Sequence, residues 1–302
     1  MLFSILIANF NNGKFFKDCY LSILNQTYTN WEVIIVDDAS TDNSLDIIKK
    51  NIGEDKRFKL FENKINKGCG FTKNRCAKLA NGEILGFLDP DDALYPIALA
   101  EMIEVHRKNL KAAIVTSKLE FVDMELNFSK NCINGEIIPN GKSYLTYGKG
   151  AFTAFATFKK DLYYKALGIN VKMKRAVDQD LYYKMEEQGQ HFFINKVLYK
   201  YRVHKGSISN NENLFKAKYW HFYARRTAYF RRKRRGLEID NFTTSEIKRI
   251  SAEYYLTRFR RIKFSSRTSN KIYLLLRSIY ADPFHRLGLK LQSLILVIIG
   301  RI

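Results

Sequence analysis

The chain has few of the residues that interrupt or cross-link a fold. Its 302 residues include only four prolines and sixteen glycines, which leaves little room for long flexible linkers. The cysteines Cys19, Cys69, Cys76 and Cys132 form no Cys-x-x-Cys pair, and no histidine stands near them at metal-ligand spacing. This pattern argues against a disulfide framework and a structural zinc site, and it favours a reducing compartment.

Long hydrophobic runs are also missing. The apolar run at 2–8 follows no basic segment and precedes no small-residue cleavage site, so it predicts a first β-strand and not a signal peptide. The run at 287–299 is very apolar but only 13 residues long, too short to span a bilayer. We therefore expect a cytoplasmic protein in which residues 287–299 form an interfacial helix.

Acidic residues are scarce in the last third of the chain. Residues 205–302 hold 22 Lys and Arg against 6 Asp and Glu, a net charge of +16, whereas residues 1–204 hold 29 against 24, a net charge of +5. This asymmetry indicates an anionic partner, namely a membrane surface, nucleic acid or an acidic saccharide. Aromatic residues such as Trp220 and Tyr223 around Arg225 also occur in nucleic-acid-binding segments, but a solvated helical face with inward aromatics is the favoured alternative.

Short apolar runs alternate with helical patterns over the first 116 residues. Strands are expected at 2–8, 32–36, 58–61, 84–88 and 112–116, and helices at 15–25, 44–50, 71–80 and 96–109. This alternation predicts an α/β fold with a mostly parallel sheet that helices cover on both faces. Further strands are expected near 151–158 and 196–201, a helix after Asp178, and helices beyond about 210.

Polar clusters follow three of these strands and should meet at one rim of the sheet. They are Ala8-Asn9 with Asn11-Asn12, then Asp37-Asp38, and finally the run Asp89-Pro90-Asp91-Asp92. Clustered carboxylates repel each other unless a cation or solvent reduces the repulsion. The cation in such sites is commonly Mg²⁺ or Mn²⁺, held by a few carboxylates and by the oxygens of a diphosphate. The alternative is an acidic turn that caps the helix near Pro96.

Taken together, these segments resemble family 2 glycosyltransferases with the GT-A fold, of the kind that builds bacterial surface polysaccharides. The matching segments are residues 3–12, 24–28, 31–42, 73–74, 81–83 and 87–92. The resemblance covers roughly residues 1–205. It implies a Rossmann-like GT-A catalytic domain at 1–209, with a nucleotide-sugar half at about 1–116 and an acceptor half at about 117–209, followed by a basic helical extension at 210–302.

The resemblance also implies roles for individual residues. Asp38 is similar to the acid that holds a uracil ring, with Ala8 and Phe10 lining the base pocket. Lys73 stands where the family often has Arg and can neutralise a phosphate. Asp89 and Asp91 resemble the two acids of the DxD motif. The metal ligands implied are Asp91, Asp92 and His204, and the metal is Mg²⁺ or Mn²⁺.

Asp178 is the residue that the resemblance implies as catalytic base. It lies in the segment 175–181, which looks like the acidic motif that begins a helix in the family, although Val177 replaces an acid that often precedes the base. One carboxylate is enough for inversion when a metal assists the leaving group. The alternative is that Asp178 and Asp180 only favour a helix N-terminus.

The expected function is therefore an inverting transfer of a sugar from a nucleotide diphosphate, UDP by expectation, to a saccharide or lipid-linked saccharide. The basic extension and residues 287–299 suit a peripheral position at the inner face of the cell membrane. Two alternatives stay open at this point. One is a GT-A-like protein that binds saccharide without turnover, and the less favoured one is a nucleic-acid-binding protein that uses the basic tail.

Overall fold

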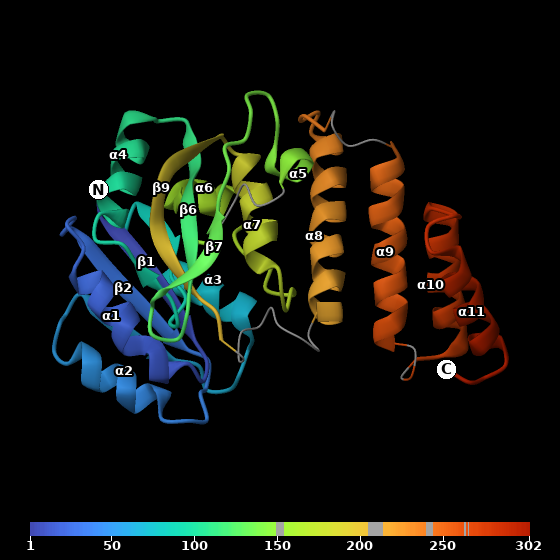
Figure 1. Ribbon diagram of the computed structural model, residues 1–302, viewed down its shortest axis with the longest axis horizontal. Coiled ribbons are helices and arrows are strands. Elements are labelled where there is room, and N and C mark those ends of the chain that lie inside the picture. The colour runs from blue at the N-terminus through green and yellow to red at the C-terminus, as the bar shows by residue number, and fades with distance from the viewer. Residues whose placement is uncertain (149–153, 205–213, 240–243, 263, 265) are drawn as a thin grey trace. The chain divides into compact units, whose positions relative to one another are not determined.

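The protein's structure is a computed structural model (Figure 1) that describes residues 1–148, 154–204, 214–239, 244–262, 264 and 266–302. The side chains of residues 129–133 and 214–217 also fall outside the description. The chain divides into two compact units, residues 1–207 and 208–302. The boundary expected at residue 209 lies outside the described residues.

Four parallel strands form one half of the central sheet. They are β1 (Phe3–Asn9), β2 (Trp31–Asp37), β3 (Phe58–Glu62) and β4 (Ile84–Phe87), in the order β3-β2-β1-β4. β1 and β2 are almost completely buried because helices cover both sheet faces, so both faces are apolar. These strands confirm the first four that the apolar runs predicted.

The other half of the sheet is mixed. β8 (Thr157–Lys159) runs antiparallel between β4 and β6 (Ala112–Val122), while β9 (Gln190–Arg202) runs parallel to β6. Two antiparallel strands complete it: β5 (Ala93–Leu94) pairs with β9, and β7 (Phe128–Asn134) pairs with β6. The strand expected at 151–158 begins only at Thr157, and residues 149–153 lie outside the described residues.

Helices pack on both faces of the parallel half. Phe3, Ile5 and Ile7 share a buried cluster with residues of α1, α2 and α4, and α3 contacts β1 and β2, where Leu6 and Ile34 are also fully buried. The helices of this unit are α1 (Phe16–Leu24), α2 (Ser44–Ile52), α3 (Cys69–Leu79), α4 (Ala98–Lys108), α5 (Tyr144–Tyr147), α6 (Lys160–Lys165) and α7 (Val177–Glu186), with a short 3-10 helix at Gly13–Phe15.

The described part of the second unit forms four helices, and the sequence predicted a helical C-terminal extension. These are α8 (Leu214–Arg234), α9 (Thr244–Ile262), α10 (Thr268–Ala281) and α11 (Leu287–Ile298), which pack side by side in chain order (Figure 1). Their core contains Tyr254, Leu256, Phe259 and Leu275. Every helix in the described part of the chain is too short or too polar to cross a bilayer.

Candidate active site

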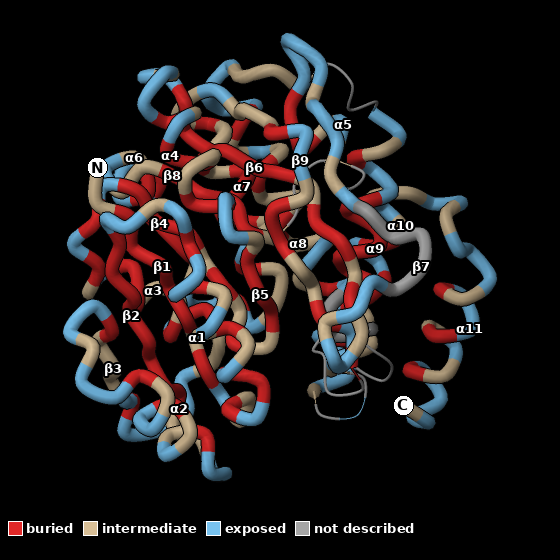
Figure 2. The backbone as a smooth tube through the Cα atoms, turned by 60° about the vertical axis from the view of Figure 1, so that its left-hand side comes forward, coloured by how far each residue is buried: buried red, intermediate tan, exposed pale blue. Residues whose placement is uncertain are grey.

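The polar residues that follow β1, β2 and β4 lie at the same edge of the sheet. Asn9 at the end of β1 is level with Asp37 at the end of β2, and the amide of Leu88 after β4 donates to the carbonyl of Leu6 at 3.0 Å. Because neighbouring parallel strands end at the same edge, this register places Ala8, Phe10, Asp38 and Asp89 on one rim. Figure 2 shows these strands as a buried layer beneath the exposed turns.

A short strand brings the acidic turn after β4 against the end of β9. β5 pairs antiparallel with β9, with Ala93 opposite Lys200, so the preceding turn lies beside the residues that follow Lys200. His204 Nε2 consequently lies 2.9 Å from Asp91 Oδ2. Both side chains are mostly buried and face each other. The structure thus brings together two of the three residues that the resemblance implied as metal ligands.

Asp92, the third implied metal ligand, is hydrogen-bonded to residues of β9. Its carboxylate accepts a hydrogen bond from the Tyr199 hydroxyl at 2.5 Å and from the Arg202 amide at 2.8 Å, and the residue is 2% exposed. Since both oxygens already have partners in the protein, the geometry favours Asp92 as the brace that fixes the acidic turn to β9. Its assignment as a metal ligand stays a prediction.

Arg202 is a site residue that the sequence did not reveal. Its buried guanidinium donates to the Asp91 carbonyl at 2.7 Å, to the Asp18 carboxylate at 2.6 Å and to the Met124 carbonyl, and its Cζ lies 4.9 Å from the centre of the Phe15 ring. Arg202 lies two residues before His204, an implied metal ligand. Its partners could not be foreseen because they come from three distant segments of the chain.

Lys73 and Asp89 form an ion pair at the rim. Lys73 Nζ lies 2.8 Å from Asp89 Oδ1, with the lysine mostly buried and the aspartate 41% exposed. Burial alone would lower the pKa of Lys73, but the negative charges around it, that of Asp89 most of all, raise this pKa well above its usual value. Lys73 therefore stays cationic, which suits the phosphate-neutralising role that the resemblance implied.

Asp178 reaches this region because α7 begins close to α3. Gly70 in the first turn of α3 allows the close approach, since a Cβ at that position would lie 2.9 Å from the Met173 carbonyl oxygen and 3.2 Å from a Val177 methyl. Asp178, exposed in the first turn of α7, consequently contributes to the raised pKa of Lys73. The predicted base and the predicted phosphate ligand thus lie within electrostatic range of each other.

The neighbouring acid, Asp180, has a different environment. It is 1% exposed and pairs with Lys184 one helical turn later at 2.7 Å, and Lys184 also donates to the Gly168 carbonyl at 3.0 Å. This arrangement fastens α7 to the preceding turn. Of the two acids at the start of α7, only Asp178 is therefore exposed to a substrate.

Asp38 holds the loop that precedes α3. Its carboxylate accepts hydrogen bonds from Asn63 Nδ2 at 2.7 Å, from the Lys67 amide at 2.8 Å and from the Gly68 amide at 2.7 Å, and it is 3% exposed. These three hydrogen bonds leave one of the roughly four acceptor positions of the carboxylate for a uracil N–H. The base-binding role of Asp38, with half-buried Ala8 and 45%-exposed Phe10, stays a prediction.

Comparison with known proteins decides the family. The sequence pattern described as Glycosyl transferase family 2 matches residues 4–163, more than half of the chain. The chain belongs to glycosyltransferase family 2. It is 34% identical over 227 residues to a chondroitin synthase of Escherichia coli, covering 71% of this chain and 32% of that protein. It is 30% identical over 214 residues to a hyaluronan synthase of Pasteurella multocida, covering 69% of this chain and 21% of that protein.

Solved structures support the same fold for this family 2 glycosyltransferase. S. aureus TarS 1–349 in complex with UDP-GlcNAc aligns with a TM-score of 0.63 at 18% identity, covering 93% of this chain and 81% of TarS 1–349. Mannosyltransferase PcManGT from Pyrobaculum calidifontis, in complex with GDP-Man and Mn²⁺, aligns with a TM-score of 0.57 at 14% identity, covering 98% and 86% of the two chains. The expected GT-A fold is confirmed. The chain itself spans only 32% or less of the two synthases.

Two carboxylates of this family 2 site, those of Asp91 and Asp92, are crowded and buried. Burial and the charge of Asp89 raise the pKa of Asp91, and burial with the charges of Asp91 and Asp89 raises the pKa of Asp92 well above its usual value. Among the described residues no group of three or more His, Cys, Asp or Glu could hold a metal by itself. Asp91 and His204 nevertheless fit Mg²⁺ or Mn²⁺, because such ions take few protein ligands when phosphates complete the shell.

Cys69 is a second residue that sequence reasoning missed. Burial raises the pKa of its thiol, Lys73 lowers it, and the charges of Asp89, Asp178 and Asp38 raise it further. All four groups belong to the predicted active site, although they come from different segments. Cys69 therefore lies among them, and no local pattern in the sequence could have shown this.

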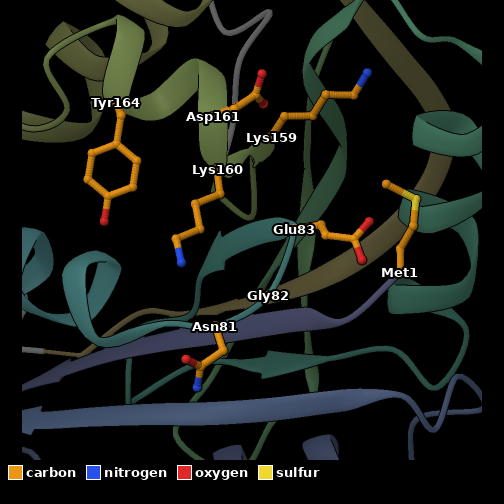
Figure 3. A pocket seen from close by; sticks show the side chains of 8 residues that line it. All are labelled: Met1, Asn81, Gly82, Glu83, Lys159, Lys160, Asp161 and Tyr164. Atoms are coloured by element: carbon orange, nitrogen blue, oxygen red, sulfur yellow. The ribbon is translucent and has the colours of Figure 1, made fainter.

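A separate cavity of about 490 Å³ lies at the opposite edge of the sheet, where β1 and β4 begin (Figure 3). Met1, Glu83 and Lys160 are among the residues that line it. Lys160 Nζ donates to the Ala80 carbonyl at 2.6 Å, so this lysine stabilises the loop before β4. The cavity contains none of the predicted site residues, and the candidate active site lies instead at the carboxyl ends of the strands.

Proposed function

We propose that this chain transfers a hexosyl or N-acetylhexosaminyl group from a UDP-linked donor to a saccharide or lipid-linked saccharide during synthesis of a cell-surface polysaccharide. The observation that carries the proposal is the Asp91–His204 pair beside the Lys73–Asp89 pair on one rim of the sheet. Relatives named as chondroitin and hyaluronan synthases, and the TarS complex with UDP-GlcNAc, support this class of donor and acceptor.

The donor would lie along the rim formed by β1, β2 and β4. Ala8, Phe10 and Asp38 would contact the nucleotide base, and Lys73 would neutralise the diphosphate as a fixed positive charge. Asp91 and His204 would hold Mg²⁺ or Mn²⁺, which stabilises the charge that develops on the diphosphate as its bond to the sugar breaks. Tyr199 and Arg202 would keep the acidic turn in place through Asp92.

The acceptor would bind on the α7 side of the donor. Asp178 would take the proton of the acceptor hydroxyl while that oxygen bonds to the anomeric carbon on the face opposite the leaving UDP, which inverts the configuration. Its exposure and its electrostatic proximity to Lys73 support this role.

We further propose that the protein works in the cytoplasm, as a peripheral protein at the inner face of the cell membrane. The support is the net charge of +16 over residues 205–302, which suits anionic lipid headgroups. A lipid-linked acceptor would be available at that surface.

The direct test is titration with UDP-GlcNAc, with and without Mn²⁺, of the wild type and of Asp91→Asn. We expect Mn²⁺ to tighten donor binding by at least about tenfold in the wild type and to have no effect in the variant, because one of two protein ligands is lost. Asp161→Asn, an exposed acid of α6, is the matched control and should behave as wild type.

Two results would contradict the proposal. If Mn²⁺ does not change the affinity of the wild type for the donor, the proposed role of the metal in donor binding is wrong. Metal-dependent binding without any transfer or donor hydrolysis across a panel of acceptors would favour the alternative of a GT-A-like protein that binds saccharide without turnover.

A further inference from the structure

Helix α11 presents apolar side chains outward. Leu291, Ile295 and Ile298 are 46%, 58% and 67% exposed, while Val297, Lys290 and Ser293 are buried and Leu289 and Leu294 pack against the core of the unit. The helix therefore carries apolar side chains on both sides, whereas a surface helix of a water-soluble domain normally exposes polar ones. The outward side of α11 is therefore an apolar surface that lacks a partner among the described residues.

A buried lysine fixes this orientation. Lys290 is fully buried, and its Nζ donates to the Ser278 carbonyl at 3.1 Å and to the Asp282 carbonyl at 2.5 Å. These carbonyls lie at the C-terminal end of α10. A cation there donates hydrogen bonds to carbonyl oxygens that have no partner within the helix, and it interacts favourably with the negative end of the helix dipole. Rotating α11 to hide its aliphatic side chains would break these bonds, so the exposure of the apolar side is a consequence of specific packing.

The turn between α10 and α11 extends the apolar surface. Tyr280 at the end of α10 and Phe284 in the turn are 85% and 84% exposed, and Leu287 begins the outward row of α11. Aromatic side chains of this kind are favoured at the boundary between lipid headgroups and acyl chains. We refer to Tyr280, Phe284, Leu287, Leu291, Ile295 and Ile298 as the α10–α11 surface.

A basic pocket lies next to this turn. It has a volume of about 230 Å³ and is lined by Phe222, Arg225, Arg249, Ile250, Glu253 and His285. His285 directly follows Phe284, so the pocket adjoins the α10–α11 surface. The one carboxylate in the lining, that of Glu253, already accepts from His285 at 2.7 Å and from Arg286 at 2.6 Å.

Positive charge dominates in the segment that contains the α10–α11 surface. Residues 263–302 hold seven Lys and Arg against a single acid, Asp282. An apolar surface with a basic border is complementary to an anionic bilayer. A second copy is a poor match, because it would bring two surfaces of the same charge together.

We propose that the α10–α11 surface inserts into the headgroup region of an anionic membrane, and that the pocket between Arg225, Arg249 and His285 receives the phosphate of a lipid headgroup. This inference rests on the membrane location proposed above and is independent of the sugar chemistry. It identifies the surface, its orientation and a lipid-binding site within residues 208–302.

The apolar part is tested by co-sedimentation of the full chain with phosphatidylcholine vesicles and with vesicles of equal parts phosphatidylcholine and phosphatidylglycerol. We expect the wild type to bind the anionic vesicles, and Leu291→Ser/Ile295→Ser to bind at least about tenfold more weakly, since two exposed aliphatic side chains no longer insert. The matched control is Leu110→Ser/Ile137→Ser, two exposed aliphatic residues of the other unit, and should bind as wild type.

Phosphate binding in the pocket is tested with variants of two neighbouring residues of α9. Arg249→Gln and Lys248→Gln each remove one exposed positive charge, but only Arg249 lines the pocket. Loss of a general surface charge should weaken anionic-vesicle binding by about fivefold in both. We expect Arg249→Gln to weaken it clearly further, and an equal loss in both variants would overturn the lipid-phosphate site.

Other outcomes would overturn the whole inference. In the first, the wild type does not sediment with anionic vesicles. In the second, analytical ultracentrifugation without lipid shows that the wild type is a dimer and that Leu291→Ser/Ile295→Ser is a monomer. Transfer to a soluble acceptor without vesicles is measured in parallel. Vesicle binding without transfer would count against the proposed enzyme function alone, and transfer without vesicle binding would count against the membrane surface alone.

Discussion

His204 Nε2 lies 2.9 Å from Asp91 Oδ2, although 113 residues separate them in the chain. The two meet because β5, which directly follows the acidic turn, pairs with β9, which ends just before His204. Arg202 and Tyr199 add bonds to the same turn. An acidic loop that is fixed in this way needs little reorganisation to receive a metal-bound diphosphate, which is the property that the proposed function requires.

Asp178→Asn separates donor binding from catalysis. We expect UDP-GlcNAc affinity in the presence of Mn²⁺ to stay within about twofold of wild type, because Asp178 contacts the acceptor side. Transfer should fall by about 10² to 10⁴, the usual contribution of a general base. Steady-state transfer and equilibrium binding together check this, and transfer at the normal rate would refute the base assignment.

Lys73→Gln should weaken UDP binding by about tenfold or more, since a charge-assisted contact to phosphate is lost. Uridine lacks the diphosphate and should bind Lys73→Gln as well as it binds the wild type. Lys73→Arg keeps the charge and should restore most of the UDP affinity. Calorimetric titration with both ligands measures this, and an equal loss for UDP and uridine would show instead that Lys73 supports the fold.

Cys69 offers a chemical reporter of donor binding. Alkylation of its thiol by N-ethylmaleimide should be slow at pH 7, because burial and three nearby carboxylates raise its pKa and only Lys73 opposes them. Saturating UDP-GlcNAc with Mn²⁺ should slow it by at least about fivefold. Peptide mass spectrometry identifies the modified residue. An alkylation rate that saturating donor leaves unchanged would place the donor elsewhere.

Glu32 links the sheet to the loop before β4 and makes stability depend on pH. Burial would raise its pKa, but hydrogen bonds from Lys59, Ser4 and Asn81 lower it to about 2. Because the folded-state pKa lies below the unfolded value of about 4.5, this stabilisation is complete above pH 4.5 and is lost as the pH falls towards 2.

Glu32→Gln should therefore destabilise the protein at pH 7 by about 1–3 kcal/mol, since the charge is lost and an NH₂ group replaces one of the two acceptor oxygens that Lys59, Ser4 and Asn81 share. The difference from wild type should shrink between pH 4.5 and 2. Denaturant unfolding at several pH values measures it, with Glu54→Gln, an exposed acid after α2, as control. A difference that is constant over this range would show that the charge of Glu32 is not the cause.

The local pattern of apolar residues in the sequence was sufficient to predict much of the fold. The apolar runs at 2–8 and 32–36 predicted β1 and β2, because a strand buried on both faces needs an uninterrupted apolar stretch. The placement of Asp38 and Asp89 at one rim also followed, since parallel strands end at the same edge. The strand expected at 151–158 was too long, because apolar periodicity does not define where pairing with β4 and β6 begins.

The remaining features depended on contacts between distant segments. No local pattern indicates that Arg202 joins Asp18 to the acidic turn, that Asp92 is engaged by Tyr199, or that Lys290 holds α11 with its apolar side outward. Periodicity within a few residues determines whether a segment forms a helix or a strand and which of its sides is apolar. Tertiary packing decides which partner each polar side chain finds and which side of a helix faces solvent.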